Sequence, residues 1–235
     1  MPAPDNTSSH NSDDYDRQIR NIIPHYDDIH NEIIRFIKIQ CPHPRTWLDT
    51  GCGTGSFIRK AQEIFPDTEF FIADPSEGML TVAARTLEGC RYSLIGRCGT
   101  AGIPATTDRR FDVITAIQCH HYLTKEGRNE AVRACYSLLN SGGFLITSEN
   151  IRPFSDEGIA RSLASWGAFQ RRAGRSESNV KDHLTRFDRE YFPITITEHL
   201  QCYRDAGFPV AEILLISGMQ GVFWCRKLGI LKFPG

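Results

Sequence analysis

The sequence has no apolar run that approaches the roughly 20 residues needed to cross a bilayer. Its eight cysteines are scattered without a Cys-x-x-Cys pair, which favours free thiols in a reducing compartment over a zinc site or a disulfide framework. The 27 basic and 28 acidic residues leave a net charge of −1, so the basic excess of a nonspecific nucleic-acid binder is missing. We therefore expect a cytoplasmic protein with neither a membrane nor a nucleic acid as partner.

The composition predicts an ordered globular protein. Of the 235 residues, 40% are hydrophobic and 23% are charged, and a chain of this length buries a core that folds without metal or disulfide staples. Residues 1–14 are polar and lack the apolar stretch of a secretory signal, so we expect them to form a disordered tail. Residues 15–235 are expected to form a single domain.

Hydrophobic periodicity predicts alternating strands and helices up to residue 150. Strands are expected at residues 46–49, 70–73, 92–95, 111–117 and 144–148. Helices are expected at residues 56–65, 78–87 and 125–139, after a helical segment at 15–39 that Pro24 should interrupt. A turn is expected at residues 140–143. This alternation predicts an α/β fold, in which a parallel sheet is covered by helices on both faces.

The pattern changes after residue 150. Residues 159–186 are polar and typical of a helix, and residues 197–206 predict one more helix. Two strands, at 211–217 and 222–228, are joined by a predicted turn at 218–221. This pair is expected to form a hairpin that adds antiparallel strands at one edge of the sheet.

Three glycines at alternate positions, Gly51, Gly53 and Gly55, separate the first strand from the following helix. Glycine lets the backbone turn sharply and approach a ligand without a clash from a Cβ atom. The free N–H groups and the positive dipole end of that helix would face the ligand. The loop therefore predicts a binding site, because three glycines would weaken a purely structural turn.

The residues around this loop indicate the kind of ligand. In a dinucleotide fingerprint the third glycine lies one position later, where this chain has Ser56. Asp49, directly before the loop, would repel a pyrophosphate but suits an ammonium group. Asp74, at the end of the second strand, can accept hydrogen bonds from both ribose hydroxyls. The pattern favours a nucleoside with a cationic amino-acid group, such as S-adenosylmethionine (SAM), and disfavours a NAD-dependent oxidoreductase.

Four motifs in order resemble those of class I SAM-dependent methyltransferases. They are LDTGCGTG at 48–55, FIADPSEGML at 71–80, FDVITAIQCHHYL at 111–123 and LLNSGGFLI at 138–146. The resemblance extends over roughly residues 15–227. It implies a Rossmann-like, seven-stranded doubly wound sheet of order 3-2-1-4-5-7-6 with the last strand antiparallel. It also implies SAM as cofactor and S-adenosylhomocysteine (SAH) as product.

The resemblance also implies roles for individual residues. Asp49 and the loop glycines would hold the methionine part of SAM, and Asp74 would hold the ribose. Ser76 and Met79 would border the adenine.

One position departs from the family. Gly99 stands where these enzymes usually have an Asp that binds the adenine amino group, and Thr100 or a backbone carbonyl would have to replace that contact. Gln118, at the end of the fourth strand, is expected to line the cofactor pocket and not to react.

Candidates for the chemistry follow the fourth and fifth strands. His120 and His121 are candidates for a general base, the alternative being that one caps the next helix while the other is exposed to solvent. Glu149 is a candidate for a base or for binding a cationic substrate, the alternative being a salt bridge to Arg152. Cys119 is expected to pack in the core. Two adjacent histidines are a weak metal signal, and we expect no metal.

Two segments are candidates to cover the site. Residues 15–40 resemble a lid of small-molecule methyltransferases, in which Tyr15, Arg20 and Tyr26 would fold over the SAM carboxylate; the alternative is an amphipathic cap. The helical insertion at 152–192 has seven basic and three acidic residues between Arg161 and Arg189, interleaved with aromatic residues. This composition is compatible with a cover for an anionic or aromatic substrate, but we favour solvated helix faces with an apolar underside, which also offer a homodimer contact.

The first hypothesis is a SAM-dependent methyltransferase that acts on a small molecule. A second is suggested by residues 198–208 and the terminal hairpin, which also resemble the synthases of carboxy-SAM. Those enzymes need an additional arginine for the added carboxylate, and the insertion offers candidates. A third is a SAM-binding regulator without catalytic activity. The acceptor atom stays open, because one fold serves many acceptors.

Overall fold

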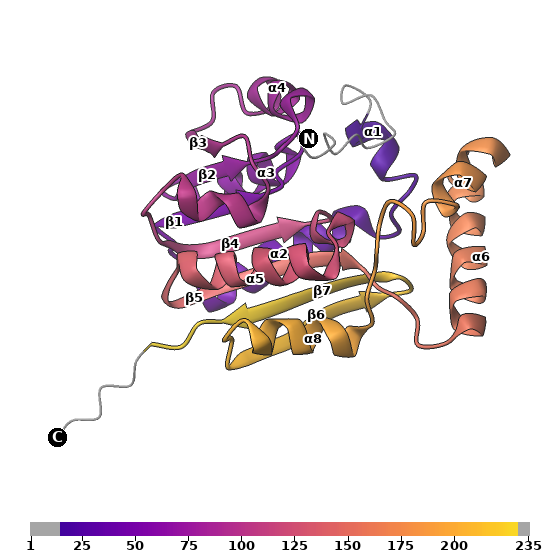
Figure 1. Cartoon of the computed structure of the whole chain (residues 1–235). Coiled ribbons are helices and arrows are strands. Elements are labelled where there is room, and N and C mark those ends of the chain that lie inside the picture. The colour runs from indigo at the N-terminus through magenta and orange to yellow at the C-terminus, as the bar shows by residue number, and fades with distance from the viewer. Residues whose placement is uncertain (1–14, 230–235) are drawn as a thin grey trace.

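The computed structural model describes residues 15–229, so the tail predicted at 1–14 lies outside the described residues. A seven-stranded sheet of order β3-β2-β1-β4-β5-β7-β6 organises this part of the chain (Figure 1). The strands are β1 Thr46–Thr50, β2 Glu69–Ala73, β3 Tyr92–Gly96, β4 Phe111–Ile117, β5 Leu139–Asn150, β6 Val210–Ser217 and β7 Gln220–Arg226. Strands β1 to β5 pair in parallel, and β7 runs antiparallel between β5 and β6. The predicted fold class and strand order are confirmed.

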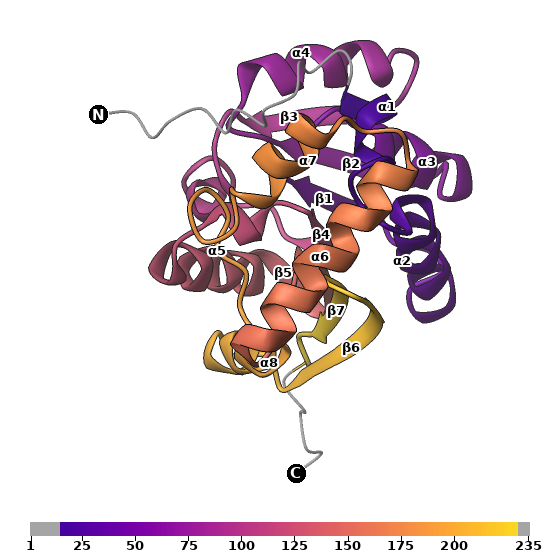
Figure 2. The ribbon, with the colours of Figure 1, turned by 90° about the vertical axis from the view of Figure 1, so that its right-hand side faces the viewer.

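Helices cover both faces of the sheet. They are α1 Tyr15–Ile19, α2 Tyr26–Gln40, α3 Ser56–Ile64, α4 Glu77–Thr86, α5 Lys125–Leu138, α6 Asp156–Arg172, α7 Glu177–Leu184 and α8 Ile196–Asp205, with the short 3₁₀ helices η2 Thr100–Ala105 and η3 His120–Tyr122. Helices α6 and α7 stand beyond the carboxyl ends of the parallel strands, and Figure 2 shows α6 crossing this end of the sheet. The predicted insertion therefore lies where a parallel sheet binds ligands.

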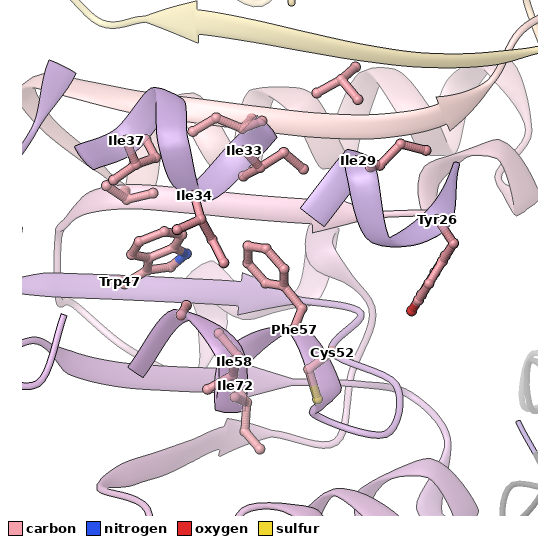
Figure 3. Packing of buried hydrophobic residues seen from close by; sticks show 14 of the residues in the cluster. Tyr26, Ile29, Ile33, Ile34, Ile37, Trp47, Cys52, Phe57, Ile58 and Ile72 are labelled. Carbon is pink, nitrogen blue, oxygen red and sulfur yellow. The ribbon is translucent and has the colours of Figure 1, made fainter. Parts of the chain in front are cut away.

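The core on one face is formed by α2 and α3 packing on β1 (Figure 3). Ile29, Ile33 and Ile37 recur every four residues and so lie on one side of α2, against the buried Trp47 and Phe57. The opposite face is covered by α5 and α8, which contribute a second buried cluster. This packing on two faces fixes the strand ends that carry the site.

The structure differs from the sequence-based expectation at two predicted turns. Residues 140–143 do not form a separate turn but belong to β5, where the register against β4 shifts and the extra residues form a bulge opposite Asp112. Gly142, with φ +85°, donates its N–H to the Lys227 carbonyl at 2.6 Å, so the bulge remains paired. In the terminal hairpin, β7 already begins at Gln220, which confines the turn to Gly218 and Met219.

The single helical stretch predicted at 159–186 is two helices. Residues 173–176 separate α6 from α7, with Gly174 at φ +88°. The Ser176 side chain accepts a hydrogen bond from the Asn179 N–H and begins α7. The predicted break near Pro24 is present, since α1 ends at Ile19 and α2 begins at Tyr26.

Candidate active site

A cavity of about 490 Å³ lies at the carboxyl ends of β1, β2 and β4, within the size range of small-molecule sites. Its lining is Tyr15, Gly51, Gly53, Asp74, Pro75, Met79, Gly99, Thr100, Ile117, Gln118, Cys119, His120, Tyr122, Leu123, Arg186, Arg189, Glu190 and Phe192. Nine of the predicted site residues belong to this lining. The others, Arg20, Tyr26, Asp49, Gly55, Ser76, His121 and Glu149, lie outside it.

The three loop glycines have different surroundings. All have positive φ, +70° at Gly51, +54° at Gly53 and +77° at Gly55. A Cβ on Gly51 would lie 2.7 Å from the Cys119 Cβ, and one on Gly55 would lie 3.0 Å from Leu87. A Cβ on Gly53 would meet nothing within 4 Å, so the backbone at Gly53 faces open space at the cavity wall. Gly55 therefore serves the packing of α3 against α4, whereas Gly53 leaves room for a ligand.

Asp74 is fixed at the cavity wall by two backbone N–H groups. Its Oδ2 accepts from Gly53 at 2.9 Å and its Oδ1 accepts from Ser76 at 2.8 Å. The Ser76 hydroxyl in turn accepts from the Met79 N–H at 3.2 Å and begins α4. Ser76 thus orients Asp74 and α4 from behind, while Asp74 and Met79 contact the cavity.

Asp49 lies behind the glycine loop. It is buried, and its Oδ1 accepts a hydrogen bond from the Thr115 hydroxyl at 2.6 Å. The Thr115 hydroxyl in turn accepts a hydrogen bond from Trp47 Nε1 at 3.0 Å. Burial raises the pKa of Asp49 to about 7, and the charge of Asp74 adds to this effect. A cation bound over the loop would stabilise the charged carboxylate, as expected for an ammonium-binding position.

Part of the cavity wall is formed by Gly99 and by Thr100, the first residue of η2. The Thr100 hydroxyl lies 2.5 Å from the Thr50 Oγ1 and 2.9 Å from His120 Nε2, so it orients the imidazole. Gly99 lines the cavity, and a Cβ there would meet nothing within 4 Å. The position where the family usually has an acid therefore offers only backbone groups to a ligand.

Gln118 has an unusual conformation at the end of β4. Its φ is +53°, which is strained for a residue with a side chain. The side-chain Nε2 donates to the Ser148 hydroxyl at 2.9 Å and to Gln220 Oε1 at 3.1 Å, and the backbone N–H donates to the Ser148 carbonyl at 2.7 Å. These bonds hold the turn that directs Gln118, Cys119 and His120 along the cavity.

His120, His121 and Glu149 form a buried cluster behind and beside the cavity. His121 Nδ1 lies 3.2 Å and His120 Nδ1 lies 3.9 Å from the Glu149 carboxylate. Neither histidine is exposed, and α5 is capped by Thr124, so the alternative of one capping and one exposed histidine is wrong. Of the three candidates for catalysis, only His120 contacts the cavity.

Burial controls the protonation of this cluster. It lowers the pKa of His120 and takes that of His121 to about 3, while it raises the pKa of Glu149 to about 7. His120 is therefore a neutral imidazole at neutral pH and able to accept a proton. Arg152 does not pair with Glu149, because its Nη1 binds Asp188 at 2.6 Å.

The Cys119 thiol lies in the cavity lining but is not activated as a nucleophile. Burial raises the pKa of Cys119, which keeps the thiol protonated.

The three residues of the predicted lid do not gather over the cavity. Tyr15 lines the cavity, but Arg20 donates to Asp27 at 2.8 and 2.9 Å and lies over the Tyr26 ring. Tyr26 is itself buried beneath, so Arg20 is not placed to hold a ligand in the cavity.

Comparisons with known proteins agree with this geometry. A family model described as "Methyltransferase domain" matches residues 48–145. The chain contains a class I SAM-dependent methyltransferase domain. The carboxy-SAM synthase of Campylobacter hominis is 25% identical over 187 residues, which cover 77% of this chain and 76% of that protein. The corresponding enzyme of Shewanella amazonensis is 26% identical over 83% of this chain and 81% of its own length.

Solved structures share the fold of the methyltransferase domain. Magnesium protoporphyrin IX methyltransferase from Synechocystis, with bound SAH, matches with a TM-score of 0.64 at 13% identity, over 92% of this chain and 95% of that one. Human N-acetylserotonin methyltransferase in complex with SAM has a TM-score of 0.58 at 12% identity, over 85% of this chain and 52% of that one. At 12–13% identity, this likeness shows that the chain shares their fold.

The cavity of the methyltransferase domain is completed by segments outside the matched region. Tyr15 comes from before it, and Arg186, Arg189, Glu190 and Phe192 come from the turn after α7. Sequence analysis counted Arg186 and Arg189 among the basic residues of the insertion, but it named no residue of this turn as a site candidate. The apolar lining residues Ile117, Tyr122 and Leu123, and Pro75 after β2, were also missed. Their position at strand ends was the available signal.

Two features are absent from residues 15–229. No group of three or more His, Cys, Asp or Glu in this range is arranged to hold a metal ion. No helix of the same range is long and apolar enough to cross a membrane.

Proposed function

We propose that this protein transfers a methyl group from SAM to a small-molecule acceptor. The observation that carries the proposal is the continuity of one cavity from the Gly53 and Asp74 wall to His120 and the turn after α7. When bound, SAM supplies a methyl group activated by a sulfonium. The chain must therefore hold the two substrates in line, exclude water and accept a proton where the acceptor carries one.

The residues present fit the cofactor. Asp74 is held with both carboxylate oxygens at the wall, where they are placed to accept from the ribose hydroxyls. Gly53 leaves open space that a side chain would fill, and Asp49 behind the loop favours an ammonium group through its buried carboxyl. Adenine recognition would fall to backbone groups near Gly99, with Met79 as an apolar wall.

His120 is the candidate base. It contacts the cavity as a neutral imidazole, with Thr100 at Nε2 and the Glu149 carboxylate on its Nδ1 side. A proton taken from an acceptor would give an imidazolium, which the nearby Glu149 would stabilise. Glu149 and His121 act through His120 and are positioning residues.

Water would be excluded by aromatic residues at the cover. Tyr15, Tyr122 and Phe192 line the cavity from three separate segments of the chain. The Phe192 N–H donates to the His121 carbonyl at 2.7 Å, and the Phe192 carbonyl accepts from Arg128 at 2.6 Å. This part of the cover is therefore anchored directly to the histidine cluster.

Calorimetric titration with SAM and SAH tests the proposal. We expect both to bind, and we expect Asp74→Asn to weaken SAH by about tenfold or more, because an amide cannot accept all the bonds of the carboxylate. Asp108→Asn, an exposed acid outside the cavity lining, is the matched control. Absence of binding by either compound at millimolar concentration would overturn the proposal.

A carboxy-SAM synthase activity is the second candidate, favoured by the curated relatives, which cover 77–86% of this chain. Mass spectrometry of the ligand released from the purified protein separates the two, because carboxy-SAM is heavier than SAM by one carboxylate group. Recovery of carboxy-SAM would favour the second candidate, and recovery of SAM or SAH alone would favour the first.

A further inference from the structure

The charged residues of the cavity lining come from two separate segments of the chain, which we call the two ends of the cavity. The end formed by the glycine loop and β2 has Asp74 in its lining and Asp49 behind it. The end formed by the turn after α7 has Arg186 and Arg189 with one acid, Glu190. SAM bears a sulfonium and an ammonium group, so its cationic parts suit the acidic end. The basic end is suited to a ligand of opposite charge.

The turn that presents the two arginines is well ordered by its own bonds. Asp188 has φ +59° and donates its N–H to the Tyr191 carbonyl at 3.0 Å, while the Arg189 and Glu190 N–H groups both donate to the Arg186 carbonyl. Arg152 binds the Asp188 carboxylate at 2.6 Å from outside. The guanidinium groups thus project from a fixed backbone, which reduces the entropy lost when a ligand binds.

The two arginines differ in their exposure and in their hydrogen bonds to other protein groups. Arg186 is only 11% exposed in its side chain, and its Nε donates to Glu190 at 2.5 Å. It also donates to the Tyr122 hydroxyl, which places an aromatic ring beside the cationic group. Arg189 is exposed at the cavity mouth, so its guanidinium is the more accessible of the two.

We propose that Arg189, supported by Arg186, binds the carboxylate of the acceptor, so that the second substrate is a small organic acid with an apolar body. The proposal rests on the proposed function. A guanidinium offers paired N–H donors in the plane that a carboxylate requires. Tyr122, Leu123 and Phe192 supply the neighbouring apolar surface for the rest of the molecule.

Glu190 competes with the ligand for Arg186. Because its carboxylate occupies the Arg186 Nε, removal of this charge would make the Arg186 guanidinium more available to an anion. The structure therefore makes two predictions of opposite sign. Arg189→Gln should weaken binding of an acid, and Glu190→Gln should strengthen it.

The test measures binding to the SAH-saturated protein by calorimetry. The probes are benzoate, phenylacetate and hexanoate, each paired with its neutral amide of nearly equal shape. We expect at least one acid to bind about tenfold more tightly than its amide. Arg189→Gln should reduce the affinity for that acid by roughly five- to twentyfold, and Glu190→Gln should raise it severalfold, with both effects reduced in high salt. Arg172→Gln, an exposed arginine on α6 outside the cavity lining, is the matched control and should change nothing.

The outcomes separate this inference from the proposed function. If SAH does not bind the wild-type protein, the proposed function fails. If SAH binds but no acid is preferred over its amide, or if Arg189→Gln behaves as the Arg172 control does, the acceptor subsite is refuted. If Arg189→Gln weakens SAH itself by as much as it weakens the acid, the arginine serves the methionine carboxylate of the cofactor and the inference is also refuted.

Discussion

Alanine at Gly51 and at Gly53 should have opposite dominant effects, although the two residues are neighbours in one loop. Both have positive φ, so a side chain at either position costs about 1–2 kcal/mol in backbone strain. At Gly51 the new Cβ would lie 2.7 Å from the Cys119 Cβ and 2.9 Å from its sulfur. The displacement of Cys119 adds about 1–3 kcal/mol of overpacking. Gly53→Ala has no such clash, because nothing lies within 4 Å of its Cβ.

The difference in stability is therefore about 1–3 kcal/mol, which corresponds to roughly 2–12 °C in the Tm of a domain of this size. Thermal unfolding without ligand measures it. The order should be reversed for binding: Gly53→Ala should lose more SAH affinity than Gly51→Ala, although it loses less stability. The methyl group of Gly53→Ala would occupy the wall beside Asp74, and we expect SAH to bind at least about tenfold more weakly.

Gly89→Ala is the matched control for this pair. Gly89 has φ +78°, a Cβ added there would also meet nothing within 4 Å, and the residue lies outside the cavity lining. It should show the backbone strain alone, with unchanged SAH affinity. Equal SAH affinities of Gly53→Ala and Gly89→Ala would refute the role given to Gly53. Equal unfolding temperatures of Gly51→Ala and Gly53→Ala would refute the clash predicted at Gly51.

Three further perturbations test the buried polar groups. The folded pKa of Glu149 is about 7, above its ordinary value of 4.5, so its protonated form adds up to about 3 kcal/mol of stability that is present below pH 4.5 and is lost as pH rises through 7. Glu149→Gln should remove this loss of stability between pH 4.5 and pH 7, measured by urea unfolding. Burial lowers the pKa of His30 from 6.5 to about 3, and its Nε2 has no hydrogen-bond partner within residues 15–229, so stability is lost as pH falls below 6.5. His30→Leu should therefore be more stable than the wild type by about 2 kcal/mol at pH 5. Equal pH profiles of stability for the variant and the wild type would contradict this. Trp166→Phe removes the bond from Nε1 to the Ile22 carbonyl at 2.6 Å and should cost about 1–3 kcal/mol, with faster proteolysis of the insertion as the readout.

The fold was predictable because its determinants are local. Alternating apolar strands and amphipathic helices identify the parallel sheet, and strand ends in a parallel sheet share one edge. Asp74 and the glycine loop follow consecutive strands, and the structure brings them into contact through the Gly53 N–H. The wall formed by Gly53 and Asp74 was therefore accessible to sequence reasoning, whereas Asp49 and Ser76, which were predicted with them, lie outside the cavity lining.

The acceptor end was less predictable, because it depends on which way neighbouring side chains point. In the tight 3₁₀ turn of η3, His120 contacts the cavity while His121 faces Glu149 and lies outside the lining. Arg20 was expected over the cofactor, but Asp27 lies in the first turn of the next helix and forms a bidentate pair with it. Periodicity does not resolve such choices, since both orientations are compatible with the same pattern.

The cavity is lined partly by the region that the family model matches and partly by segments outside it. Similarity to relatives therefore says more about the cofactor than about the acceptor. The region matched by the family model, residues 48–145, contains the glycine loop, Asp74 and His120. Arg186, Arg189 and Phe192 lie outside it, on a turn held by Arg128 and His121 through the Phe192 backbone. A change in that turn would alter the proposed acceptor subsite, while Asp74 and Gly53 belong to other segments of the chain. Sheet and cofactor contacts can therefore be shared among enzymes whose second substrates differ, and the acceptor must be sought by measuring binding at this turn.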